Sequence, residues 1–263
     1  MVARTCTDVR KAEAVNVSGF ADLAKAVGNL QYENRDYVLL LRGQRSDYRN
    51  KHRNTTIKPS IFRGHNGNPN PAVLQERFAK LRQAELLLID AYDRHGLPRV
   101  PEIKKRQVLR WSILQHYEIV DTPFLDLTHS LRVAASFASD HDEEDGYVFV
   151  LGVPNISGAI TTSSEAELQV IRLSSVCPPQ AFRPHIQEGY LIGEYPDISV
   201  YEQKQLYQAH EVDFGRRLVA KFRFKKADLW NDPNFPPIPR AALYPDRHDP
   251  LAEIAARMKE ELK

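Results

Sequence analysis

The segment Trp111–Ala138, WSILQHYEIVDTPFLDLTHSLRVAASFA, combines two apolar runs with a dense group of polar side chains. Polar residues inside core-forming sequence either satisfy one another or contact a ligand. Residues 131–138 have the apolar pattern of a helix packed on a core, and Thr128 or Ser130 is suited to cap its first turn. A strand that ends in polar residues and leads into a helix is a common arrangement for a ligand site. The polar residues of this segment are His116, Tyr117, Asp121, Asp126, Thr128, His129 and Ser130.

The composition is that of an ordinary globular protein. The chain has 263 residues, of which 42% are apolar and 27% charged, so it is long enough to bury a sizeable core. No run approaches the roughly eighteen apolar residues of a membrane span. The N-terminal sequence MVARTCTDVRKAEA has no apolar core of the kind found in a signal peptide. We therefore expect a cytoplasmic protein with no membrane partner.

Most familiar catalytic and metal-binding patterns are absent from the sequence. It contains no GxSxG, GxxxxGK[ST], GxGxxG or HExxH motif and no signature of a nucleic-acid-binding module. Its two cysteines, Cys6 and Cys177, are far apart, which favours reduced thiols over a disulfide or a catalytic nucleophile. The nine histidines share no helical face, and the acidic run 141–146 resembles a solvated turn. We expect no metal site.

Positive charge is concentrated near the N-terminus although the net charge is only +2. Residues 42–63 contain seven lysines and arginines and a single acid, Asp47. Such an excess suits phosphate or nucleic-acid binding, and it equally suits a solvated basic loop. The candidate nucleic-acid contacts are Arg45, Arg49, Lys51 and Arg53.

Hydrophobic periodicity predicts alternating helices and strands within one domain. An apolar strand at 37–41 is predicted to end at Arg42, with Gly43 allowing the chain to turn. No repeat, low-complexity segment or long linker divides the chain. The predicted helices are 16–30, 71–94, 102–117 and 250–262, and the further strands are 147–153, 168–172, 190–192 and 218–224.

Several polar residues have both a structural and a functional interpretation. Arg42 could form a salt bridge with Asp126 or bind an anion, since its planar guanidinium serves either role. A structural role is favoured for Asp126, for a core His116 and for a packed Tyr117. Helix capping is likewise favoured for Thr128 and Ser130. For Glu188 the two interpretations, a solvated turn residue and a functional acid, have nearly equal weight.

These elements together resemble the FRG domain family, named for an aromatic-Arg-Gly motif that stands here as Leu41–Gln44, LRGQ. Later elements of the family are similar to residues 59–63 (PSIFR), 114–117 (LQHY), 122–130 (TPFLDLTHS), 134–138 (AASFA), 183–190 and 243–246. The family usually has Gly where this chain has Glu118, and Trp where it has Leu127. The resemblance implies a single domain over residues 15–260 that follows an N-terminal extension, residues 1–14.

The layout is also similar, more loosely, to ADP-ribosyltransferases of the arginine-serine-glutamate class. That resemblance implies an α+β fold whose split, mainly antiparallel sheet is flanked by helices. In that class an arginine holds NAD, a Ser/Thr element supports the nicotinamide ribose, and a late glutamate orients the ribose 2′-hydroxyl and the nucleophile. The roles fall on Arg42, on Thr128 with Ser130, and on Glu188. Gln187 is the alternative to Glu188, because the FRG family usually has Gln in this element.

The two resemblances together imply NAD-dependent ADP-ribosyl transfer to RNA or DNA, as in a toxin-antitoxin or phage-defence protein with an antitoxin partner. An aromatic wall for the nicotinamide is expected from Tyr117 or Phe137. The alternatives are an NAD glycohydrolase and a non-catalytic nucleotide or nucleic-acid-binding module. The expected NAD-binding residues are Arg42, Gly43, Gln44, His116, Tyr117, Asp126, Thr128, Ser130 and Phe137, and the expected catalytic residues are Arg42, Gln187 and Glu188.

Overall fold

A computed structural model describes residues 5–64, 69–245 and 249–263. The chain forms two compact units, each assembled from three separate segments. The first unit comprises Met1–Ile57, Leu127–Ile156 and Asp213–Leu243. The second comprises Lys58–Asp126, Ser157–Val212 and Tyr244–Lys263.

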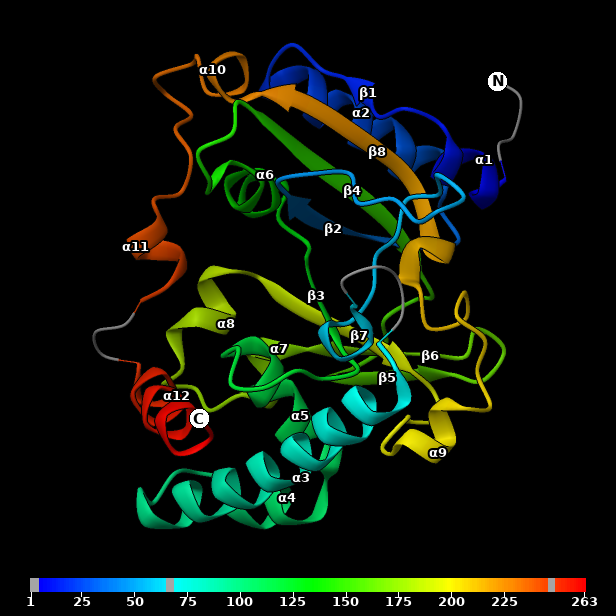
Figure 1. The fold of residues 1–263 in the computed structure, drawn as a ribbon. Helices are drawn as coiled ribbons and strands as arrows, with labels where there is room; N and C mark the ends of the chain where they lie inside the picture. Colours follow the sequence, from blue (N-terminus) through cyan, green and yellow to red (C-terminus); the bar gives the residue numbers. More distant parts are fainter. Residues whose placement is uncertain (1–4, 65–68, 246–248) are drawn as a thin grey trace. The chain divides into compact units, whose positions relative to one another are not determined.

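The first unit is built on a sheet whose strands follow the order β1-β8-β4-β2-β3 (Figure 1). The short β1 pairs with β8 in parallel, and the other neighbours pair antiparallel. The strands are β1 (Val15–Asn16), β2 (Val38–Gln44), β4 (Asp145–Val153), β8 (Leu218–Lys225) and the last residues of β3 (Leu125–Thr128).

Two helices, α2 (Phe20–Glu33) and α6 (Leu131–Ser139), pack against one face of this sheet. Leu23 and Val27 of α2 and the alanines of α6 share a core with inward-facing residues of β2, β4 and β8. The α6 sequence favours this packing because small residues repeat along its buried side. The remaining short helices of the unit are α1 (Cys6–Lys11), η2 (Phe214–Arg217), α10 (Lys226–Leu229) and α11 (Arg240–Leu243).

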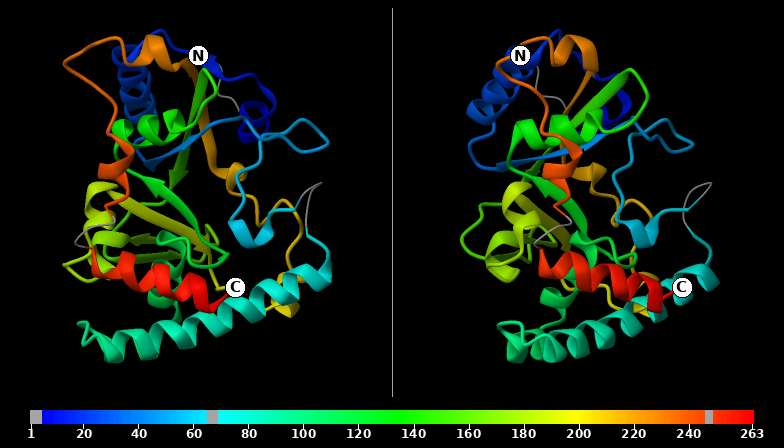
Figure 2. Two further views of the ribbon diagram at one scale, coloured as in Figure 1. Left: turned by 60° about the vertical axis from the view of Figure 1, so that its left-hand side comes forward. Right: turned by 90° about the vertical axis from the view of Figure 1, so that its left-hand side faces the viewer.

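The second unit contains an antiparallel sheet of order β7-β6-β5 and a larger helical core. Helices α3 and α12 lie side by side within this unit in both views of Figure 2. Its strands are β5 (Ile160–Ser163), β6 (Leu168–Arg172) and β7 (Gly189–Glu194). Its helices are η1 (Ser60–Phe62), α3 (Pro71–Arg94), α4 (Val100–Lys105), α5 (Gln107–His116), α7 (Leu173–Val176), α8 (Phe182–Ile186), α9 (Tyr201–Lys204) and α12 (Pro250–Glu261).

The predicted α+β class, with mainly antiparallel strands flanked by helices, is confirmed. The helix predicted at 71–94 and the strand predicted at 168–172 have the expected bounds, and α12 ends one residue earlier than predicted. No helix in the described part of the chain has the length and apolarity required to cross a bilayer.

The strands predicted at 147–153, 190–192 and 218–224 are longer in the structure, at Asp145–Val153, Gly189–Glu194 and Leu218–Lys225. Three other predicted elements were wrong in their bounds. The helix predicted at 16–30 is α2, Phe20–Glu33, which begins later because Asn16 pairs in β1 and Gly19 occupies the N-cap. The helix predicted at 102–117 is interrupted at Arg106, whose backbone is extended, and Arg110 Nη1 donates to the Ile103 and Lys104 carbonyls at the end of α4. The strand predicted to end at Arg42 continues to Gln44.

Candidate functional site

Arg42 lies within β2, where three buried leucines precede it and its own side chain is partly exposed. Side chains alternate between the faces of a strand, so Arg42 points to the face opposite Leu41. Arg42 is in register with Phe149 of β4, and Phe149 is in register with Lys221 of β8. The three side chains therefore form a row across one face of the first unit's sheet, and α6 covers the other face.

The close approach of β2 to α6 explains why a glycine, Gly43, follows Arg42. A Cβ atom added to Gly43 would lie 1.9 Å from the Ala134 carbonyl oxygen and 2.7 Å from the Ala138 amide nitrogen. Both are backbone atoms of α6 and cannot move without shifting the helix. The Arg-Gly pair thus aligns β2 closely with α6 and presents the guanidinium on the opposite face.

Thr128 and Ser130 form the entry to α6, as the capping interpretation predicts. Thr128 Oγ1 accepts a hydrogen bond from the Ser130 amide at 3.0 Å, and Ser130 Oγ accepts one from the Val133 amide at 3.5 Å. Thr128 pairs with Leu41 in the sheet. Thr128 therefore shares the face of Leu41, opposite to Arg42. Phe137 is a partly buried residue of α6.

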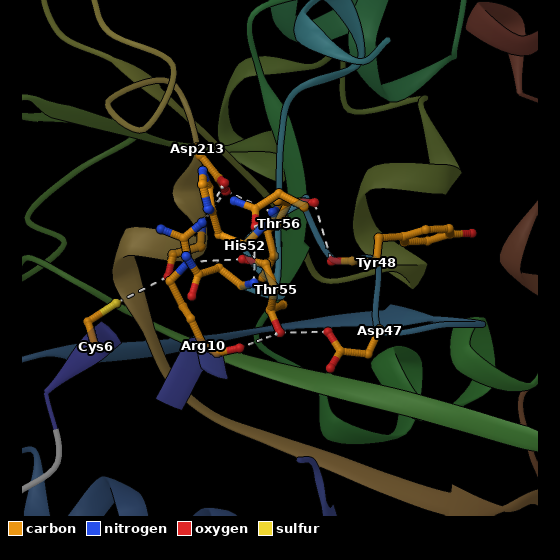
Figure 3. A network of polar contacts seen from close by, with 12 residues as sticks. Cys6, Arg10, Asp47, Tyr48, His52, Thr55, Thr56 and Asp213 are labelled. Carbon is orange, nitrogen blue, oxygen red and sulfur yellow. Dashed lines mark hydrogen bonds and ion pairs between the residues drawn. The ribbon is translucent and has the colours of Figure 1, made fainter. Parts of the chain in front are cut away.

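The segment after β2 is held by a network of buried ion pairs and hydrogen bonds (Figure 3). Lys221 is only 2% exposed, and its Nζ donates to Asp47 Oδ2 at 2.9 Å and to Thr55 Oγ1 at 2.6 Å. Arg10 of α1 bonds Asp213 Oδ2 at 2.7 Å, and Asp213 Oδ1 accepts from the Ile57 amide at 2.8 Å. The network ties α1 and residues 47–57 to the end of the sheet that carries Lys221.

The four predicted nucleic-acid contacts have different surroundings. Arg49 pairs with Asp47 and with Glu13, both at 2.9 Å, which gives it a structural role. Arg45, Lys51 and Arg53 are exposed, and Arg45 Nε donates to the Tyr48 hydroxyl at 2.9 Å. Three of the four side chains are therefore accessible to a polyanion.

In the second unit, polar residues from the opening sequence segment form a hydrogen-bonded chain. Gln115 Nε2 donates to Asp126 Oδ2 at 2.6 Å, and the Thr122 hydroxyl donates to Gln115 Oε1. Ser60 Oγ in turn accepts from the Thr122 amide at 3.1 Å. This chain fixes Asp126 on β3 relative to the C-terminal end of α5.

His116 completes that chain as a fully buried partner of Asp126. Its Nδ1 lies 3.2 Å from Asp126 Oδ1. Burial lowers the pKa of His116, and Arg183 acts in the same direction, while Asp126 and Glu118 oppose the shift. Its Nε2 is buried and has no hydrogen-bond partner among the described residues. The geometry is that of a buried imidazole oriented by a carboxylate, an arrangement also found in general bases.

Tyr117 is 1% exposed and belongs to the helical core of the second unit. Its hydroxyl donates to Asp249 Oδ2 at 2.8 Å, and burial raises its pKa. The Arg183 guanidinium lies over the rings of Tyr117 and Tyr244, at 5.5 Å and 4.6 Å from the ring centroids. These contacts support the packed interpretation of Tyr117. Asp246, the last residue of the C-terminal element LYPD, lies outside the described residues.

Gln187 and Glu188 connect α8 to β7. Gln187 is buried at the C-cap of α8, whereas Glu188 is exposed and has a left-handed φ of 44°. A Cβ atom added to Gly189 would lie 2.8 Å from Leu173 Cδ1 and 3.4 Å from His116 Cε1. The histidine therefore packs beside the backbone that directly follows Glu188.

The predicted site residues fall into two groups, and their functional roles stay predictions. Arg42, Gly43, Gln44, Thr128, Ser130 and Phe137 belong to the first unit, and His116, Tyr117, Asp126, Gln187 and Glu188 belong to the second. Within the second unit the structure brings His116 to both Asp126 and Gly189. Within the first it directs Arg42 and Thr128 to opposite faces.

Sequence reasoning missed the residues that hold these groups in position. Gln115 and Thr122 lie inside the segment first singled out, and the Asp-Pro pair that begins α12 could have indicated Asp249 as a cap. Both cysteines are free, and burial raises the pKa of each thiol. No group of three or more His, Cys, Asp or Glu side chains within the described ranges is arranged to hold a metal ion.

Comparisons with known proteins support one resemblance. No curated protein and no solved structure matches the chain. Neither comparison therefore adds support for an ADP-ribosyltransferase. The family model of the FRG domain matches residues 40–146, from β2 to the first residues of β4, and this match supports the FRG family.

Proposed function

We propose that this chain is an NAD-dependent ADP-ribosyltransferase that modifies RNA or DNA. The observation that carries the proposal is the position of Arg42, partly exposed on a strand whose next residue, Gly43, packs directly on α6. A guanidinium held on a rigid strand is suited to a pyrophosphate, which it can bind through two parallel hydrogen bonds. The matched range 40–146 includes Arg42, most of this strand and all of α6.

The reaction requires a carboxylate near the ribose. The bond between ribose C1′ and the nicotinamide nitrogen breaks, and its electron pair leaves with neutral nicotinamide. An oxygen or nitrogen of the acceptor then bonds to C1′ and releases a proton. The ribose carries positive charge between these steps, which an anionic side chain stabilises. We assign this role to Glu188, an exposed carboxylate on the residue before Gly189, the glycine that packs beside His116.

A nucleic-acid acceptor is supported by the exposed basic residues that follow β2. Arg45, Lys51 and Arg53 are exposed, and two hydrogen bonds from the His52 and Asn54 amides to Asn50 Oδ1 define the turn between them. Phosphate contacts of this kind position a strand without reading its sequence.

The test is incubation of the protein with NAD labelled in the adenylate phosphate, together with cellular RNA, DNA and protein. We expect label to transfer to nucleic acid. Arg42→Gln is expected to lower transfer about 100-fold or more through weaker NAD binding. Glu188→Gln is expected to lower it by a similar factor while NAD binding is retained.

A matched control for Glu188 is Glu167→Gln. Glu167 is also exposed, has a left-handed φ of 48° and precedes a strand of the same unit. Transfer by this control should equal that of the parent protein. Release of free ADP-ribose without transfer would favour an NAD glycohydrolase. Intact NAD and an unchanged melting temperature in its presence would contradict both enzymes and leave the non-catalytic binding module.

A further inference from the structure

A pocket of about 320 Å³ lies within the second unit, between η1, the beginning of α3 and α9. Its volume is at the lower end of the range for small-molecule sites. None of its lining residues has a role in the proposed transfer reaction. A ligand in this pocket would therefore be distinct from the proposed NAD.

Aromatic and aliphatic side chains form most of the pocket wall. Phe62 and Leu74 are its most buried lining residues, at 2% and 6% exposure. Tyr201 and Tyr207 also line it and pack in part against the core of the unit. Such rings can stack on flat heteroaromatic groups, and this stacking depends little on which group is bound.

The charged group of the pocket is a partly buried lysine. Lys204 Nζ donates to the Tyr207 carbonyl at 2.8 Å, which leaves two further N–H donors. Burial lowers the pKa of Lys204 and nearby Lys58 acts in the same direction, while Glu211 opposes the shift. No carboxylate is among the lining residues that the structure describes. An anion in the pocket would therefore meet a partly desolvated cation, and the nearby acid Glu211 is not one of the described lining residues.

The wall formed by residues 199–207 is fixed by its own hydrogen bonds. The Ser199 amide and hydroxyl donate to Gln203 Oε1 at 2.7 Å and 2.9 Å. The Leu206 amide donates to the Gln203 carbonyl at 3.0 Å, and the Tyr207 amide to the Lys204 carbonyl at 3.1 Å. A ligand would consequently meet a largely preformed site.

We infer that this pocket binds a free nucleoside 5′-monophosphate, whose base stacks on Tyr201 or Tyr207 and whose phosphate contacts Lys204. The combination of aromatic walls with one cation suits a ligand that joins a flat ring to a single anionic group. The volume suits one nucleotide better than a dinucleotide such as NAD. The inference shares no residue with the proposed NAD site and does not depend on it.

The experiment is calorimetric titration of the full chain with AMP, carried out in an Arg42→Gln background so that binding at the proposed NAD site does not contribute. We expect AMP to bind, and adenosine or inorganic phosphate alone to bind more weakly. Lys204→Met should lower the AMP affinity at least tenfold, and Lys204→Arg, which keeps the charge, should lower it less. Tyr201→Leu should also weaken AMP binding.

Lys80→Met is the matched control, because Lys80 is an exposed lysine on α3 outside the pocket. Its AMP affinity should equal that of the parent. The inference is overturned if millimolar AMP does not bind, if Lys204→Met and Lys80→Met bind AMP equally, or if phosphate alone binds as tightly as AMP. Loss of NAD transfer in Arg42→Gln with AMP binding intact keeps the two proposals distinct.

Discussion

At the scale of single residues, Gly43 provides the most direct test of how β2 packs on α6. We expect Gly43→Ala to lower the free energy of unfolding by about 2–3 kcal/mol, because its Cβ would overlap backbone atoms of Ala134 and Ala138. Urea unfolding followed by circular dichroism measures the change.

Gly28→Ala is the control for that substitution. Gly28 lies inside α2, and an added Cβ would meet nothing within 4 Å. Alanine should therefore raise the free energy of unfolding by up to about 1 kcal/mol through helix propensity. Equal effects of the two substitutions on the free energy of unfolding would contradict the close packing of Gly43 against the α6 backbone.

Glu118 and Glu188 illustrate what a single sequence does not reveal about its backbone. Their φ values of 53° and 44° are left-handed, a conformation that glycine adopts without cost and other residues adopt rarely. The resemblance to a family that usually has glycine at position 118 was an indirect signal of that geometry. No such family pattern indicated a left-handed backbone at Glu188, so local propensity would have predicted a negative φ there.

At the scale of elements, the sequence predicted the basic segment after β2 only in part. A count of charges cannot distinguish a basic side chain that faces solvent from one that neutralises a buried acid. Asp47, the single acid of the segment, recruits both Arg49 and the distant Lys221. The lysine within the otherwise apolar strand Leu218–Phe222 was the sequence signal for a buried ion pair.

Lys221→Met should destabilise the fold by about 3 kcal/mol, since it leaves Asp47, 8% exposed, with Arg49 as its remaining cation. Equilibrium unfolding in urea measures this loss. Arg223→Met, two residues along the same strand, removes an ion pair with Asp145 whose side chains are 46% and 28% exposed. It should cost no more than about 1 kcal/mol. A loss as small for Lys221→Met would contradict a structural role for the buried pair.

At the scale of the whole molecule, periodicity predicted the α+β class and most of the longer elements, because those elements carry their own amphipathic pattern. It did not predict the division into two units, each built from three segments. Strand order depends on contacts between distant segments, and the two-residue β1 and the short helices α7 to α11 bury too little to leave a periodic signal.

The same limit applies to the candidate site. The sequence placed Arg42 on a strand and the 111–138 segment at a strand–helix connection, as the structure has them. It placed the 183–190 element before a strand but did not predict the short helix α8 within it. It could not assign directions to their side chains. The opposite orientations of Arg42 and Thr128 follow from pairing in the sheet, and the contact of His116 with Gly189 follows from packing between segments about seventy residues apart.

The pH dependence of global stability provides a further prediction. His116 has a pKa below 6.5 in the folded protein, chiefly because of burial. The unfolded chain therefore binds this proton more readily as the pH falls below about 6.5. The contribution of His116 to stability should be complete above that pH and should decline on acidification, by at most about 1.4 kcal/mol per pH unit.

His116→Gln isolates this contribution from those of the other histidines. The free energy of unfolding of the parent minus that of His116→Gln, measured by urea titration at pH 8.0 and pH 5.5, should be larger at pH 8.0. A smaller difference at pH 8.0 would mean that the folded protein holds a protonated His116 paired with Asp126, with the pKa raised.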